Sequence, residues 1–144
     1  MQIVGFNLTK AFIERKEDIK GKFKVNSRIE FKDLKEEKIT LIEGKTALKF
    51  DFEYNIEYEP KLAELNFKGF VLAVSEPKAA KETLEEWKKK KSINPELKIK
   101  LLNLIFHKCN VKALGLEEDF NLPPHLRLPY ITPKAEKSDS TYTG

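Results

Sequence analysis

The sequence predicts an α+β protein in which a four-stranded antiparallel sheet, a meander, is followed by a short and a long C-terminal helix. Apolar and polar residues alternate with a period of two through the first half of the chain, which is typical of strands with one solvent-facing side. Prolines then open two segments whose apolar residues have helical spacing. The length of 144 residues suits one domain. We expect this domain over residues 1–133 and a polar, flexible tail over 134–144.

Two of the predicted strands alternate most regularly. In residues 21–32 the apolar side chains of one face are Phe23, Val25, Ile29 and Phe31. In residues 47–58 they are Leu48, Phe50, Phe52, Tyr54, Ile56 and Tyr58. A helix would scatter these rings around its axis, so the period of two indicates strands.

The other two strands are less regular. The apolar residues of the opening strand are Val4, Phe6, Leu8, Ala11 and Ile13. Their parity changes near Thr9–Lys10, which predicts a β-bulge. Residues 63–74 form the last strand, and beyond Gly69 it is apolar on both faces, so both faces need cover there. The segment 38–44 is either a small strand or a linking loop.

Two helices follow the strands. Pro77 opens the short one, with Ser75 or Glu76 as its cap and an apolar stripe of Ala80, Leu84 and Trp87. The long one is expected at about 95–114. Its N-cap is Asn94, Pro95 is its first residue, and Gly115 ends it in left-handed geometry.

The long helix is apolar around much of its circumference. At 100° per residue the apolar side chains cover an arc of about 200°, whereas a surface helix needs about 100°. These side chains are Leu97, Leu101, Leu102, Leu104, Ile105, Phe106, Cys109, Val111 and Ala113. One face can cover the sheet while another meets a second copy, so we expect a homo-oligomer, either a dimer or a tetramer. The alternative is a monomer whose C-terminal segment covers the second face.

The segment after the long helix, "DFNLPPHLRLPYITP", contains four of the seven prolines. It also keeps five large apolar side chains, those of Leu122, Leu126, Leu128, Tyr130 and Ile131. Proline cannot continue a helix and fixes φ near −65°. We expect a strap that lies along the long helix or over a sheet edge.

This order of elements resembles that of the SecB-type export chaperones. In that family a proline begins the long helix and a segment similar to "LNLAPVNF" follows it. Here Pro95 begins the helix and "FNLPPHLRLPYI" follows, with "NLPP" at 121–124 as the sharpest match. The opening "IVGFNLTKAFIERK" resembles the first strand of the family. The resemblance covers most of the chain. It implies a SecB-like chaperone that binds non-native or extended polypeptide in an apolar groove, without catalysis and in the service of protein transport.

Two features depart from the family. Bacterial members are acidic, whereas this chain has a net charge of +4. The tail that helps such members contact a motor ATPase is here the polar "TPKAEKSDSTYTG". The wider family acts on varied clients, so the resemblance does not name the client.

Composition narrows the class of protein further. The 40% apolar content is too high for disorder, and the 35% charged content is too high for a membrane protein. Abundant lysine and glutamate are typical of heat-adapted proteins. Cys109 has no partner for a disulfide, and the N-terminus lacks the pattern of a signal peptide, so a cytoplasmic location is expected.

The sequence contains no catalytic signature. His107 and Cys109 are two residues apart, which places them on different sides of a helix and separates a nucleophile from its base. Cys109 is expected to be a buried small side chain. The spacing of metal ligands and the glycine-rich loop of a phosphate site are both missing from the sequence. We therefore expect neither an enzyme nor a cofactor.

Two groups of residues are candidates for binding. The first is aromatic and would line the peptide groove: Phe50, Phe52, Tyr54, Tyr58, Phe70 and Trp87. For most of these, core packing is the competing interpretation. The second group is basic and defines the alternative function, an RNA- or ribosome-associated protein: Lys88, Lys89, Lys90, Lys91, Lys98 and Lys100. A solvated helix end, where lysines complement the dipole, is the competing interpretation of that cluster.

Overall fold

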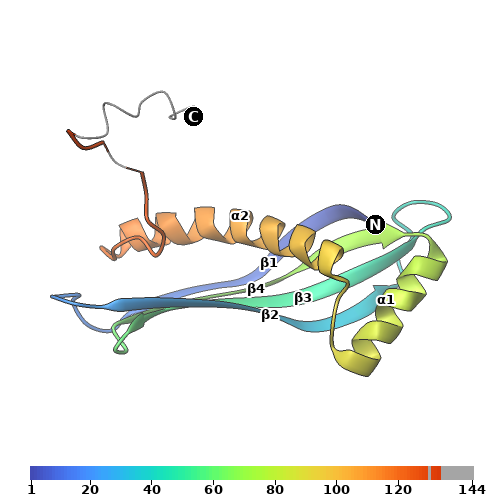
Figure 1. Cartoon of the computed structure of the whole chain (residues 1–144), viewed down its shortest axis with the longest axis horizontal. Coiled ribbons are helices and arrows are strands. Elements are labelled where there is room, and N and C mark those ends of the chain that lie inside the picture. Colours follow the sequence, from blue (N-terminus) through green and yellow to red (C-terminus); the bar gives the residue numbers. More distant parts are fainter. Residues whose placement is uncertain (130, 134–144) are drawn as a thin grey trace.

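The computed structural model describes residues 1–129 and 131–133, and these form one sheet with two helices packed on it (Figure 1). The strands are β1 (Gln2–Arg15), β2 (Lys24–Glu37), β3 (Thr46–Glu59) and β4 (Ala63–Ser75). The helices are α1 (Pro77–Lys90) and α2 (Pro95–Asp119). The predicted α+β class is confirmed. The segment 38–44 is a loop, and the predicted tail 134–144 lies outside the described residues.

All neighbouring strands are antiparallel, and their order across the sheet is β1-β4-β3-β2. Strands β2, β3 and β4 form a meander of consecutive hairpins. Strand β1 lies beside β4, so the β1–β2 connection crosses from one edge of the sheet to the other, as in a Greek key. This order leaves β1 and β2 as the two edge strands.

The bulge predicted in the first strand is present. The register between β1 and β4 shifts between Leu8 and Lys10, so the side chains beyond it change faces. A second shift lies between Ile3 and Gly5, and a third interrupts β2 between Phe31 and Asp33. The regular part of edge strand β2 therefore ends at Phe31.

The core lies on the face of the sheet that carries both helices. The apolar β3 residues of this face are each no more than 2% exposed: Leu48, Phe50, Phe52, Tyr54, Ile56 and Tyr58. Trp87 from α1 and Leu102 from α2 line one cavity with Ile29 and Phe31 of β2, so both helices pack on this same face. The opposite face is mostly charged, with ion pairs such as Lys32–Glu53 across the strands.

The second face of β4 is only partly covered. Phe70 and Leu72 point to that face and are half-buried, while Val74 is buried. The Lys49 ammonium lies 4.5 Å from the centroid of the Phe70 ring, a cation–π contact. The sequence predicts that both faces of β4 are covered beyond Gly69. In the structure one face is covered completely and the other only in part.

Both helices begin where the sequence predicts. Pro77 is the first residue of α1, and Glu76 is its N-cap without a side-chain hydrogen bond. At α2 the Asn94 side chain accepts a hydrogen bond from the Glu96 N–H, and Pro95 follows the cap. Within the described part of the chain, neither helix combines the length and the apolarity needed to cross a membrane.

The predicted end of α2 is wrong, because the helix continues through Gly115 to Asp119. Its buried residues recur every four positions: Leu97, Leu101, Ile105, Cys109, Ala113 and Glu117. This stripe extends beyond Gly115, so packing and the contacts of Glu117 outweigh the modest helical cost of one glycine, about 1 kcal/mol. The left-handed residue after the helix is Asn121, with φ of 55°.

Candidate peptide-binding groove

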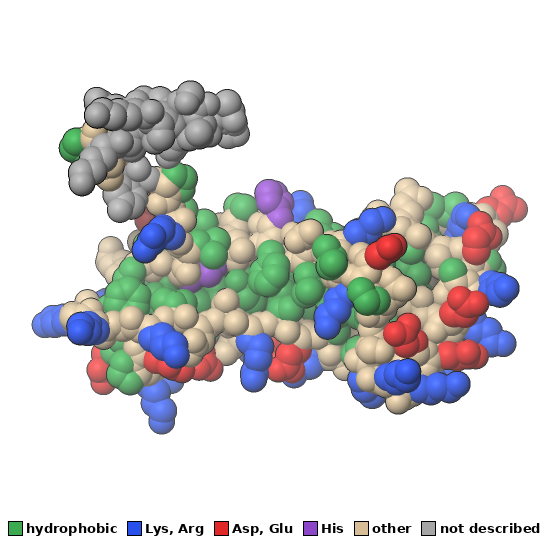
Figure 2. Space-filling view, in the orientation of Figure 1, with side chains coloured by type: hydrophobic (Ala, Val, Ile, Leu, Met, Phe, Trp, Pro, Cys, Tyr) green, Lys and Arg blue, Asp and Glu red, His purple; other side chains and the backbone are tan. Residues whose placement is uncertain are grey.

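A groove runs between α2 and the free edge strand β2. One side of α2 presents residues at intervals of four: Lys98, Leu102, Phe106 and Asn110. Facing them on β2 are Val25, Ile29 and Phe31, which are all only half-buried. Figure 2 shows hydrophobic side chains in a band between the helix and the sheet. We call this surface the α2–β2 groove.

The end of the groove near α1 contains a cavity of about 410 Å³. Its apolar lining comes from Ile29, Phe31, Trp87, Ile93 and Leu102. Its charged lining comes from Glu30, Lys91 and Lys98. We call it the Trp87 cavity. It is large enough for one or two apolar side chains with a polar group beside them.

The groove matches the length of a short extended peptide. From Lys98 to Asn110 the helix advances by about 18 Å at 1.5 Å per residue. From Val25 to Phe31 the strand advances by about 20 Å at 3.3 Å per residue. The two walls therefore accommodate about six residues of an extended chain.

The strap closes the other end of the groove through a buried polar network. The His125 ring places Nε2 2.9 Å from Oδ1 of Asn110 and Nδ1 2.7 Å from Oε2 of Glu117. The His125 backbone N–H donates to Oε1 of Glu117 at 3.0 Å. Both side chains of the His125–Glu117 pair are only 1% exposed. This network fixes the strap to the last turns of α2.

Two tyrosines of β3 join the same network from the sheet. The Tyr54 hydroxyl donates to Oδ1 of Asn110 at 2.8 Å, and the Tyr58 hydroxyl donates to the Pro123 carbonyl. Burial raises the pKa of Tyr54 to about 12. Burial, and then the nearby Glu117, raise the pKa of Tyr58 well above its usual value. Both hydroxyls therefore remain neutral donors at physiological pH.

The strap packs against α2 less extensively than the sequence predicts. Leu122 is buried against the core, but Leu126 is 41%, Leu128 48% and Ile131 77% exposed. Tyr130 lies outside the described residues. Among the described strap residues, the packed ones lie near Leu122 and His125, where the hydrogen bonds of Glu117 and Tyr58 hold the segment.

The predicted aromatic residues do not form one accessible surface. Phe50, Phe52, Tyr54 and Tyr58 lie in the core beneath the groove, at most 2% exposed, and Trp87 is 6% exposed at its end. Phe70 points to the opposite face of the sheet. The accessible walls are formed instead by Ile29, Phe31, Leu102 and Phe106. The alternation of residues in β2 shows which face Ile29 and Phe31 occupy. That this strand is an uncovered edge follows from the strand order.

The six predicted lysines divide into two groups. Lys88, Lys89 and Lys90 occupy the last turn of α1, where they complement the negative end of its dipole. Lys100 is exposed on α2. Lys91 and Lys98 line the Trp87 cavity, and the Lys91 ammonium lies 5.3 Å from the centroid of the Trp87 ring. The structure therefore places two of the six at the groove.

The two side chains considered for chemistry lie in different environments, one buried and one exposed. Cys109 is fully buried, and burial raises the pKa of its thiol to about 12, so the thiolate is disfavoured at physiological pH. His107 is exposed. Among the described residues there is no group of three or more His, Cys, Asp or Glu side chains that could hold a metal ion.

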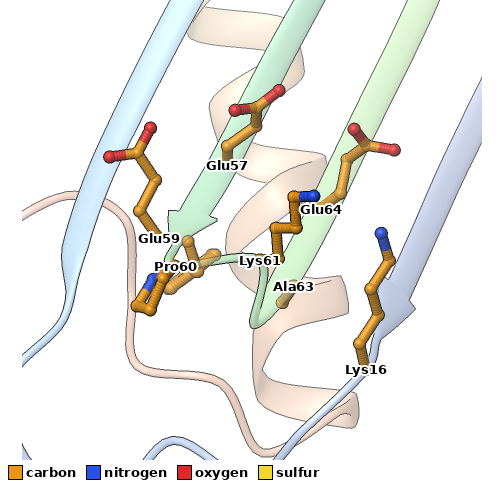
Figure 3. Close-up of a pocket in the computed structure, with 8 residues that line it drawn as sticks. Lys16, Glu57, Glu59, Pro60, Lys61, Ala63 and Glu64 are labelled. Atoms are coloured by element: carbon orange, nitrogen blue, oxygen red, sulfur yellow. The ribbon is translucent and has the colours of Figure 1, made fainter.

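Another hollow, of about 490 Å³, lies at the β3–β4 turn. Glu57, Glu59 and Glu64 line it together with Lys16 and Lys61 (Figure 3). The cis Glu59–Pro60 bond and the left-handed Lys61 shape this turn. Five of its eight lining residues are charged, against three of the eight that line the Trp87 cavity, so we place the candidate site at the α2–β2 groove.

The four antiparallel strands and the two helices on one face define a SecB-like α+β fold. The structure is similar to that of the SecB-like chaperone of Mycobacterium tuberculosis, which was solved in complex with a ChAD peptide from the HigA1 antitoxin. The TM-score is 0.53, and the match covers 91% of this chain and 90% of that chain at 13% identity. At this identity the likeness is one of fold. No protein-family model matches the sequence, and no curated protein matches it significantly.

Proposed function

We propose that this protein is a SecB-like molecular chaperone that binds non-native or extended polypeptide in the α2–β2 groove, without catalysis. The observation that carries the proposal is the row of half-buried apolar side chains beside a free strand edge. The SecB-like fold supports it, since the solved neighbour is a chaperone in complex with a peptide.

Binding would combine two interactions. The backbone of an extended client would pair with the outer edge of β2, whose regular part runs from Lys24 to Phe31. Alternate client side chains would then enter the groove, and each well-buried one would contribute about 1.5–3 kcal/mol before ordering costs. Because backbone pairing is independent of sequence, such a site accepts many clients.

Replacing groove residues tests the proposal. We expect the double variant Phe31→Ser/Leu102→Ser to bind a permanently unfolded, cysteine-blocked protein at least tenfold more weakly, because two apolar contacts are lost. The measurement is fluorescence anisotropy of the labelled client. The control is Ile39→Ser, which changes a 66% exposed residue of the loop 38–44 that does not line the Trp87 cavity, and it should leave the affinity unchanged.

Trp87 is a poor residue for this test. It is 6% exposed and packed in the core, so Trp87→Ala would cost about 3–5 kcal/mol of stability and confuse unfolding with lost binding. If the double variant keeps its fold by circular dichroism and also keeps its affinity for the client, the groove assignment is wrong.

Self-association is the second part of the proposal. The outward side of α2 exposes Ile99 and Val111, at 60% and 65%. Within the described residues the strap does not cover them, because its Leu126 and Leu128 are themselves exposed. The exposure of Ile99 and Val111 supports a second copy as the occupant that we propose for this side of α2.

A further inference from the structure

The Trp87 cavity combines apolar walls with two cationic side chains. Lys91 follows the last turn of α1 and Lys98 belongs to the first turn of α2, so the two come from different elements to line the same hollow. Neither ammonium has an ion-pair partner among the residues that the structure describes. The cavity therefore has unneutralised positive charge at its rim.

The acidic residue that also lines the cavity is already engaged. The Glu30 carboxylate pairs with Arg28 at 3.1 Å and with Lys32 at 2.7 Å. These two cations, Lys32 first, lower the pKa of Glu30. Glu30 therefore stays ionised but bound to its own strand, and it leaves the two cavity lysines unneutralised.

Local geometry places both lysines at the mouth of the cavity. Lys91 is the left-handed C-cap of α1, with φ of 52°, and its N–H donates to the Trp87 carbonyl. Lys98 lies near the positive end of the α2 dipole, which favours anions over cations. Glu96, in the same turn, is two residues away and thus points about 200° around the helix. An anion between the two lysines would relieve an unfavourable arrangement.

A buried donor lies in the same place. The Trp87 indole N–H is inaccessible and has no hydrogen-bond acceptor among the described residues. The Lys91 side chain lies over the ring of this indole. Buried donors without acceptors are uncommon in folded proteins, and this one belongs to a side chain that lines the cavity.

From these observations we infer that the Trp87 cavity binds a carboxylate next to a large apolar side chain, and that the groove selects extended clients carrying this pair. The inference rests on the proposed function and adds a specificity to it. The apolar side chain would lie against Ile29, Phe31 and Leu102, and the carboxylate would lie between Lys91 and Lys98. The carboxylate can be that of an Asp or Glu side chain or that of a client C-terminus.

Three labelled peptides test this inference. They share one apolar sequence of nine residues with an amidated end and differ at a single central position, which is Asp, Asn or Lys. We expect the Asp peptide to bind about five- to tenfold more tightly than the isosteric Asn peptide in fluorescence anisotropy at low salt, and the Lys peptide to bind most weakly. The preference should shrink at 0.5 M salt because the rim charges are screened.

A matched pair of variants locates the effect. Lys91→Gln/Lys98→Gln should abolish the difference between the Asp and Asn peptides while leaving the affinity for the Asn peptide unchanged. Lys88→Gln/Lys89→Gln makes the same change in net charge outside the cavity and should keep the preference. Equal losses in both variants would mean attraction by net charge alone and would overturn the inference.

The remaining outcomes separate this inference from the proposed function. If the wild-type protein binds the Asp and Asn peptides equally, the inference fails and the groove stands. If it binds none of the three, both fail. A single-stranded RNA that binds more tightly than the Asp peptide and is lost in Lys91→Gln/Lys98→Gln would assign the lysines to phosphate and overturn the inference. An Asn peptide with a free C-terminus, compared with its amide, reports which carboxylate is preferred.

Discussion

At the scale of single residues, Gly69 shows how closely two strands approach. A Cβ at this position would lie 2.2 Å from the Asn7 carbonyl oxygen and 3.0 Å from the Phe52 ring. No substituent fits there without a shift of the β1 backbone. Gly69 is therefore required by the sheet, next to the stacked rings of Phe6 and Phe52, whose centroids are 5.6 Å apart.

We predict that Gly69→Ala lowers the free energy of unfolding by about 2–3 kcal/mol, because the added methyl group overpacks the contact between β1 and β4. Gly5→Ala on the paired strand is the matched control. Its Cβ would meet the Leu72 side chain at an ordinary 3.6 Å, so we expect a change within about 0.5 kcal/mol. Urea unfolding measures both, and equal effects would contradict the role of Gly69.

Residue identity and alternation together predicted part of the packing. The lone cysteine was correctly predicted to be a buried small side chain, and the alternation placed the β3 aromatics on one face. The sequence did not separate Phe52, at 2% exposure, from its cross-strand neighbour Phe31, which is half-buried at the groove. Both are phenylalanines in strands whose apolar and polar residues alternate. Their difference arises because β3 is central and β2 is an edge.

At the scale of elements, the end of α2 depends on a residue whose sequence context gave no warning. Glu117 lies in an acidic stretch that suggests a solvated surface, yet it is 1% exposed. Its carboxylate accepts the His125 N–H, and the His125 ring lies beside it. The partner is eight residues away and beyond two prolines, so neither helical periodicity nor spacing indicates the pair.

We predict that Glu117→Leu destabilises the protein by about 2–4 kcal/mol and releases the strap, because it leaves the buried His125 N–H and ring without their acceptor. Glu118→Leu changes the adjacent exposed carboxylate and should cost no more than about 0.5 kcal/mol. Urea unfolding measures the free energy of unfolding of both variants. Hydrogen exchange of the His125 amide shows whether the strap has been released from α2. If the His125 amide keeps its protection in Glu117→Leu, then Glu117 does not hold the strap on α2.

At the scale of the whole molecule, periodicity established the class of fold but not the neighbours of each strand. Alternation shows which face a residue occupies, and it is silent about which strand lies beside β1. The crossing β1–β2 connection follows from long-range pairing between β1 and β4. That pairing makes β2 an edge and creates the groove, so the position of the candidate site does not follow from the alternation of residues.

The exposed outer side of α2 leads to a prediction about assembly. A chain of 16.7 kDa should show at least twice this mass in light scattering at micromolar concentration, because Ile99 and Val111 lose exposed apolar area on association. The variant Ile99→Asp/Val111→Asp places charge in that contact and should shift the protein to monomers. Lys108→Gln/Lys112→Gln changes the net charge equally on the same helix and should leave the mass unchanged. A wild-type protein that remains monomeric as its concentration rises would show that this side of α2 faces solvent alone.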